Sequence, residues 1–260
     1  PRCAVAECKT NAVLGKNRLK RRVGNRQKGE PVKTIEHPII YPESDGKPMA
    51  DNTEQYEWIT RIKGNLDVIF ASQEEVFVAG DLLWYPAEGK PNICTAPDVM
   101  VAVGRPKGYR GSYMQWKEEN ISPQVVFEIL SPGNTAREMR EKRLFYEKYG
   151  VEEYYVYDPL DFNLEVWRRW ENELHLLSHA ESIGYTSPRL GVRFLSLPQS
   201  VLQMFRPDGE PFKTMLELEN ERTRLEDERD SALRQAEAER QRAERLAAKL
   251  RELGLNPDAL

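Results

Sequence analysis

The stretch Pro123–Gly133, with the sequence PQVVFEILSPG, constrains the fold of this chain more than any other. Apolar residues surround a single acid, Glu128, so the segment has the composition of a buried β-strand that carries one carboxylate. An ionised carboxylate in apolar surroundings is costly unless a partner compensates its charge. We therefore expect Glu128 to be matched by a cation, a proton or a metal ion.

A second apolar run, residues 97–103, also opens on an acid, Asp98. Side chains alternate along a strand, so Asp98 shares a face with Met100, and Glu128 shares a face with Val126. If the two strands pair, their carboxylates can come within reach of one Mg²⁺ ion, which prefers oxygen ligands and keeps several waters. The pattern predicts a metal site at the edge of a sheet.

The rest of residues 35–212 reads as alternating helices and strands. A helix begins near Asp51-Asn-Thr-Glu, where three residue types suited to an N-cap stand together. A second helix ends at Gly150, a residue favoured just past a helix C-terminus. We expect strands at 75–86 (broken at Gly80-Asp81), 97–103, 123–130, 151–159, 164–170 and 174–179, and the second helix over Ala136–Tyr149. This order predicts an α/β or α+β domain, with a mixed sheet and helices packed on it.

From residue 213 onward the composition changes. Residues 217–253 contain neither Pro nor Gly and are dominated by Glu, Arg, Ala and Leu. Leu218 and Leu225 are a heptad apart, as are Ala236 and Ala243, but large apolar residues are sparse between Ser231 and Ala243. Two interpretations stay open: a single long helix held by Glu/Arg pairs, or a coiled coil that forms a homodimer.

Residues 1–34 carry ten Lys and Arg against two acids, while the whole chain has a net charge of −4. We expect this segment to be a disordered basic tail, with a nucleic-acid-binding arm as the alternative. The remaining body is acidic, which argues against non-specific coating of nucleic acid.

Two composition features bear on location. No apolar run reaches the roughly 20 residues that a membrane span needs. The three cysteines form no CxxC pair, which favours a reducing compartment. We therefore expect a cytoplasmic protein with no membrane segment.

The segment Arg105–Lys117 mixes basic and aromatic residues, RPKGYRGSYMQWK. Such interleaving suits phosphate contacts and base stacking. It also suits a loop that packs its aromatic side chains onto the domain. On the first interpretation, the residues that would bind nucleic acid are Arg105, Lys107, Arg110 and Lys117.

Several of these segments together resemble the Uma-type family, which is abundant in cyanobacteria and belongs to the restriction-endonuclease-like proteins of the PD-(D/E)XK superfamily. The resemblance rests on Pro97-Asp98-Val, on Val126-Phe-Glu128-Ile-Leu-Ser-Pro132, on Glu141-Lys142 with Tyr146, and on Gly150-Val-Glu-Glu-Tyr-Tyr-Val-Tyr-Asp158-Pro159. It covers roughly residues 40–210 and leaves out the basic tail and the C-terminal helix. It implies a central mixed sheet flanked by helices, and metal-dependent hydrolysis of phosphodiesters in DNA.

Carried over by residue, the resemblance makes Asp98 and Glu128 the ligands of Mg²⁺, for which Mn²⁺ would substitute. The superfamily places a lysine two residues after the glutamate, where this chain has Leu130. Lys142, on the following helix, matches a lysine of the Uma-type pattern and could reach the site from there. A further acid could come from Asp81 or Glu54.

Two functions are therefore weighed. The first is a Mg²⁺-dependent DNA endonuclease in which Asp98, Glu128 and Lys142 are catalytic. The second is an inactive nuclease-like module that acts in protein assembly through a C-terminal coiled coil. Domain boundaries follow the same division: a tail over 1–34, a nuclease-like domain over 35–212 and a helix over 213–260.

Overall fold

The computed structural model describes residues 39–46 and 48–253 of the 260-residue chain. These residues divide into two compact units, the first ending at Phe212 and the second beginning at Lys213. The basic tail expected over residues 1–34 lies outside the described residues. None of the helices in the described residues combines the length and the hydropathy that crossing a membrane requires.

The first unit is built on a mixed sheet. Its strands are β1 (Val76–Gly80), β3 (Val99–Val103), β5 (Val125–Ile129), β6 (Glu153–Asp158), β7 (Asn163–Trp170) and β8 (Glu173–Leu176). In space they follow the order β1-β3-β5-β6-β7-β8. Only β5 and β6 run parallel, and every other neighbouring pair in this sheet is antiparallel. The predicted mixed sheet with flanking helices is confirmed.

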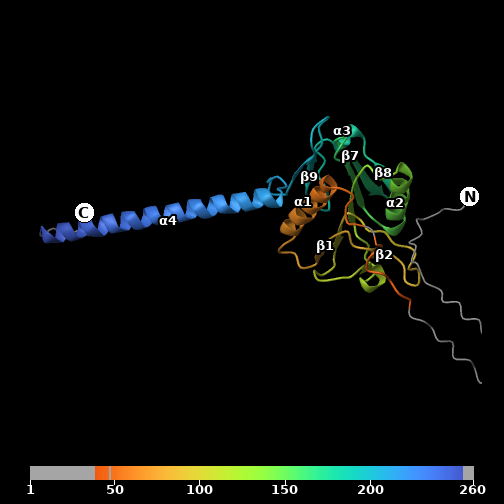
Figure 1. The fold of residues 1–260 in the computed structure, drawn as a ribbon, viewed down its shortest axis with the longest axis horizontal. Coiled ribbons are helices and arrows are strands. Elements are labelled where there is room, and N and C mark those ends of the chain that lie inside the picture. Colours follow the sequence, from red (N-terminus) through yellow and green to blue (C-terminus); the bar gives the residue numbers. More distant parts are fainter. Residues whose placement is uncertain (1–38, 47, 254–260) are drawn as a thin grey trace, which may run out of the picture. The chain divides into compact units, whose positions relative to one another are not determined.

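Two helices, α1 (Thr53–Ile69) and α2 (Ala136–Tyr149), cover the two faces of this sheet (Figure 1). Alternate strand residues divide between them, as the pleat requires. Val99 and Phe127 pack in the cluster that contains α1, whereas Met100 and Val126 pack in the cluster that contains α2. The parity of β3 and β5 thus decides which helix each side chain meets.

The ends of both helices follow from local sequence. Asn52 caps α1, and its side chain accepts a hydrogen bond of 2.9 Å from the backbone N–H of Gln55. Thr135 caps α2 in the same way, through the backbone N–H of Glu138 at 3.2 Å. Gly150 ends α2 with a φ of 95°, in the left-handed region that suits glycine. The predicted bounds of α2 are confirmed.

Some elements were not predicted. They are β4 (Tyr113–Met114), the 3₁₀ turn Gln115–Lys117, α3 (His179–Ser182), and the hairpin of β9 (Arg193–Leu195) and β10 (Gln203–Phe205). β4 pairs with β2 (Trp84–Tyr85), which lies in the second half of the strand predicted over 75–86. The strand expected over 174–179 ends at Leu176, because Ser178 and Glu181 form a capping box that starts α3.

The second unit is the helix α4 (Met215–Glu252), 38 residues long. Thr214 is its N-cap and forms a capping box with Glu217. No residue of α4 is buried. The structure therefore agrees with a long helix after residue 213, and it leaves the choice between a single helix and a coiled coil to other arguments.

Candidate active site

Asp98 and Glu128 lie opposite each other on neighbouring strands. Asp98 directly precedes β3, and the first residue of that strand, Val99, has Phe127 of β5 as its Cα partner. The next pair outward along this antiparallel ladder is therefore Asp98 and Glu128. Both acids are buried, at 8% and 2% exposure. The expectation that the two strands pair and bring their acids to one face is confirmed.

Glu128 has two partners, both from α2. The Nζ of Lys142 donates a hydrogen bond of 2.7 Å to its Oε2, and the hydroxyl of Tyr146 donates to its Oε1. Residues four apart in a helix lie on the same face, so α2 presents Lys142 and Tyr146 together. The compensating charge that the sequence required for Glu128 is thus a lysine from the covering helix.

Asp98 is held by the end of β5 and by α1. Its Oδ2 accepts a hydrogen bond of 2.6 Å from the backbone N–H of Ile129. Burial raises the pKa of Asp98 to about 8, and the negative charge of Glu128 adds to the increase. The charge of Lys142 and the hydrogen bonds from Ile129 and Gln55 lower the pKa without cancelling that rise.

Leu130 brings no positive charge to Glu128, and Lys142 of α2 supplies one. Leu130 follows Glu128 by two residues and packs with the apolar cluster under α2. Burial lowers the pKa of Lys142, but the charges of Glu128 and Asp98 outweigh this effect and raise it. The lysine side chain keeps 21% exposure, so its ammonium group is anchored on Glu128 while part of the side chain stays accessible.

The two lower-ranked acids have different outcomes. Asp81 follows β1 and lies close enough to Lys142 and Glu128 for both charges to affect its pKa, which burial raises above the ordinary value. Glu54 is exposed, and its Oε1 accepts a hydrogen bond of 3.2 Å from the indole of Trp58. Asp81 therefore borders the site, whereas Glu54 is engaged elsewhere.

The α1 residue that contacts the site is Gln55, which the sequence reasoning missed. Its Nε2 donates to the carbonyl of Ile129 at 2.9 Å, and its Oε1 accepts from the backbone N–H of Asp51 at 2.8 Å. Gln55 is 6% exposed. The helical spacing could have shown this role, because Gln55 lies on the same buried face of α1 as Ile59 and Ile62.

Tyr146 is the second residue without a predicted role. Its ring lies parallel to that of Trp84, with centroids 6.3 Å apart, and it is fully buried. The spacing of four residues from Lys142 could have shown that both side chains face the same strand. Trp84 and the neighbouring strands fix the ring and aim its hydroxyl at Glu128.

Carboxylate oxygens are the donor type that a hard divalent cation prefers. Asp98 and Glu128 are both buried, Lys142 binds Glu128, and its charge also acts on Asp98, whose pKa burial nevertheless raises. Mg²⁺ is often bound by one or two carboxylates, with waters and substrate phosphates as further ligands. Over residues 39–46 and 48–253, no group of three or more His, Cys, Asp and Glu side chains could hold a metal ion. Asp98 and Glu128 would thus be the protein's share of such a site.

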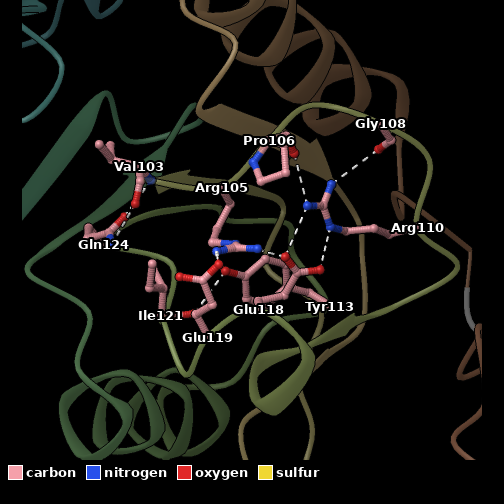
Figure 2. Close-up of polar contacts among 10 residues, drawn as sticks. All are labelled: Val103, Arg105, Pro106, Gly108, Arg110, Tyr113, Glu118, Glu119, Ile121 and Gln124. Carbon is pink, nitrogen blue, oxygen red and sulfur yellow. Dashed lines mark hydrogen bonds and ion pairs between the residues drawn. The ribbon is translucent and has the colours of Figure 1, made fainter.

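In the basic loop after β3, two arginines bind an acid of the same loop. Both Arg105 and Arg110 point at Glu118 (Figure 2), with Nε to carboxylate distances of 3.0 and 2.7 Å. Arg105 also pairs with Glu119 at 2.8 Å, and the guanidinium of Arg110 lies 4.0 Å from the centre of the Phe77 ring. These two arginines hold the loop to the domain.

The other two basic residues of this loop differ from each other. The Nζ of Lys107 donates to the carbonyls of Phe70 and Ala71, at 2.8 and 2.6 Å, where α1 ends. Lys117 is exposed. Arg105, Lys107 and Arg110 therefore direct their donors at the protein, whereas Lys117 does not, and nucleic-acid binding by these four residues stays a prediction.

The loop also starts at the far end of β3 from the acids. Asp98 precedes that strand and the loop follows Val103, so about five residues, or roughly 17 Å of extended chain, separate them. This topology is a second reason why Arg105 does not belong to the site of Asp98 and Glu128.

Comparisons with known proteins give a family match and a structural resemblance. The sequence model of the family described as "Uma2: Putative restriction endonuclease" matches residues 44–198, which is more than half of the chain. Among solved structures, the chain resembles a "putative nuclease belonging to DUF820 from Anabaena variabilis". That similarity has 18% identity and a TM-score of 0.42, and it covers 56% of this chain and 77% of the other. No match was found among curated proteins.

Proposed function

Because this chain belongs to the Uma2 family of restriction-endonuclease-like proteins, we propose that it is a Mg²⁺-dependent DNA endonuclease of the PD-(D/E)XK type. One observation carries the proposal: two facing buried acids, Asp98 and Glu128, lie beside a lysine of the covering helix, which binds Glu128 and whose charge acts on Asp98. Apolar residues at these buried positions would often make the fold at least as stable, so two acids there suggest a task other than stability.

In this proposal Asp98 and Glu128 hold the metal ion. A Mg²⁺ ion bound there would polarise the scissile phosphate and lower the pKa of a bound water. Asp81, which borders the site, adds negative charge beside the two ligands. The backbone N–H of Ile129 orients the carboxylate of Asp98, through the hydrogen bond at its Oδ2.

Lys142 supplies the cation that Leu130 cannot. An ammonium group has three N–H donors, so Lys142 can keep its bond to Glu128 and still donate to a phosphate oxygen. Donors fixed in advance toward developing negative charge are among the larger contributions to catalysis. Tyr146 and Gln55 are positioning residues, because they hold Glu128 and the end of β5 without facing the substrate position.

Cleavage of supercoiled plasmid in Mg²⁺ or Mn²⁺ tests the proposal. We expect Glu128→Gln to lose nearly all metal-dependent cleavage, and Lys142→Ala to lose about 10²- to 10³-fold, the usual range for one lost transition-state donor. The matched control is Asp158→Asn, since Asp158 is an acid near the same end of the sheet whose carboxylate accepts from the backbone N–H of Leu160 at 2.9 Å. Equal cleavage by wild type and Glu128→Gln would refute the enzymatic claim.

One observation favours the second function, an inactive module that serves assembly. Both carboxylate oxygens of Glu128 already accept hydrogen bonds from α2, which also suits a structural ion pair in an inactive module that serves assembly. Calorimetric titration with Mn²⁺ separates the two. Binding that is lost in Asp98→Asn supports the nuclease, whereas no heat at millimolar Mn²⁺ supports the assembly module.

A further inference from the structure

Most of the large apolar residues of α4 fall on two alternating heptad positions, and Leu216 and Leu233 lie outside them. The first set is Met215, Arg222, Arg229, Ala236, Ala243 and Leu250, and the second is Leu218, Leu225, Ala232, Glu239, Leu246 and Leu253. Together they form the a and d stripe of a coiled coil. Its most exposed apolar members, Met215, Leu225, Leu246 and Leu253, are between 53% and 75% exposed. The stripe is apolar at both ends of the helix and contains charges and alanines in its middle.

The charges flanking this stripe change sign along the helix. The flanking positions of the first half carry Glu219, Glu221, Glu226 and Glu228, and those of the second half carry Arg240, Arg242 and Lys249. Charges at these positions set partner choice and orientation in coiled coils. A helix with an acidic first half and a basic second half is complementary to a reversed copy of itself.

A parallel pair of α4 helices would place like charges together. Identical positions face each other in a parallel dimer, so Arg222 would meet Arg222, Arg229 would meet Arg229 and Glu239 would meet Glu239 at the seam. The flanking pair of Glu221 with Glu226 would add a further repulsion. Like charges facing each other in a contact are destabilising, so the sequence disfavours this arrangement.

We propose that α4 binds the α4 of a second copy of the chain in antiparallel orientation, in the register that puts Leu218 opposite Leu250. In an antiparallel pair each residue of the first set faces one of the second. The resulting layers are Met215 with Leu253, Leu218 with Leu250, Arg222 with Leu246, Leu225 with Ala243, Arg229 with Glu239, and Ala232 with Ala236. Each charge that was repelled in the parallel pair now meets an opposite charge or an aliphatic side chain.

The flanking charges match in the same register. Glu228 faces Arg242, Glu226 faces Arg240 and Glu221, which its own chain pairs with Lys213 at 2.7 Å, faces Lys249. Near the two-fold axis, Leu233 of one helix faces Leu233 of the other beside the alanine layer. Leu233 is 61% exposed in the single chain, so the pairing covers it. Small residues at the centre allow close approach, and Leu233 supplies the apolar area that they lack.

The orientation has a consequence for the nuclease units. The chain enters each helix at Thr214, so in an antiparallel pair the two units are attached at opposite ends. A helix of 38 residues is about 57 Å long at about 1.5 Å per residue.

Charge reversal with rescue tests the pairing in the full chain. Glu228→Arg creates two like-charge contacts with Arg242 in the antiparallel dimer, and Arg242→Glu does the same with Glu228. Because the dimer contains this contact twice, we expect each single change to raise the dissociation constant on the order of tenfold. The double variant should restore the wild-type dissociation constant. Sedimentation measures the dissociation constant. Arg234→Glu, on the outward face of the helix, is the matched control and should leave the dissociation constant unchanged.

Disulfide trapping tests the orientation. In a background with Cys3, Cys8 and Cys94 replaced by serine, oxidation of a mixture of Leu218→Cys and Leu250→Cys chains of different size should give the mixed dimer. Self-linked Leu218→Cys dimers would indicate a parallel pair and overturn the proposal. A wild-type chain that stays monomeric at its highest soluble concentration would overturn it as well, as would a double charge variant that fails to recover dimerisation while its helix content is unchanged.

Discussion

At the scale of single residues, Glu128 shows how a costly charge can be retained in a sheet. Its carboxylate is 2% exposed and would be strongly unfavourable without compensation. Lys142 and Tyr146 compensate it from one face of α2. A buried ion pair of this kind contributes less to stability than well-packed apolar residues of similar volume often do.

Asp98 gives a pH-dependent prediction. Its pKa is about 8 in the fold against an ordinary value of 3.8, so between these values the unfolded chain has released a proton that the folded chain retains. The free energy of unfolding of the metal-free protein therefore falls as pH rises from about 4 to about 8. We predict that Asp98→Asn gains stability relative to wild type, by about 3 kcal/mol between pH 5 and pH 7.5. Urea unfolding in EDTA measures it.

The asparagine keeps an acceptor for the backbone N–H of Ile129, so the comparison isolates the charge. Measuring both proteins in the same buffers removes the contribution of other titrating groups such as Asp81, whose pKa burial also raises. A difference between the two proteins that stays constant across this pH range would contradict the assignment of a raised pKa to Asp98.

At the scale of elements, the loop between β3 and β5 depends on one carboxylate. Burial alone would raise the pKa of Glu118, but hydrogen bonds from Arg110 and Arg105 outweigh it and lower the pKa. The side chains of Arg105, Arg110 and Glu118 keep only 10 to 12% exposure. The loop is therefore organised around a nearly buried ion cluster.

Removing the shared carboxylate should destabilise the fold. We predict that Glu118→Gln lowers the free energy of unfolding by about 2 to 4 kcal/mol, because two guanidinium groups lose their common partner. Urea unfolding measures the effect. The control Lys117→Ala changes an exposed residue of the same loop and should stay within about 0.5 kcal/mol of wild type. Arg110→Ala losing DNA affinity while keeping full stability would contradict the structural role.

At the scale of the whole molecule, the two units have separate tasks in the proposals above. The apolar clusters on both sides of the sheet contain residues up to Phe212, and none of α4. Stability of the nuclease unit should thus come from its own core, while α4 provides association. If α4 forms a dimer, the stability that association adds to the chain depends on protein concentration.

Deletion of residues 213–260 tests this division of tasks. We predict a monomer that retains metal-dependent cleavage of DNA, with a rate per site within about threefold of the full chain, because Asp98, Glu128 and Lys142 all remain. Plasmid cleavage and sedimentation on the same preparation measure the two properties. Loss of cleavage together with an unchanged melting temperature would show that the site needs the helix or the dimer.

Much of the fold follows from local sequence, because caps and periodicity act over a few residues. Thr135 and Gly150 define α2 before any tertiary contact is considered. The alternation in residues 97–103 and 123–130 puts Asp98 on the face of Met100 and Glu128 on the face of Val126, since side-chain parity is a property of a single strand. The register of β3 with β5 then brings the two acids together. The heptads of α4 are equally local.

The partners of these side chains were decided by tertiary structure. The sequence alone required a compensating charge for Glu128, but only the docking of α2 on the sheet determines that Lys142 provides it. The first helix contributes Gln55 and not Glu54, because a rotation of one residue, about 100° around the helix axis, separates a buried position from an exposed one. Arg105 and Arg110 likewise bind Glu118 because the loop folds back on itself. Contacts between distant segments depend on strand register and helix docking, which no single segment encodes.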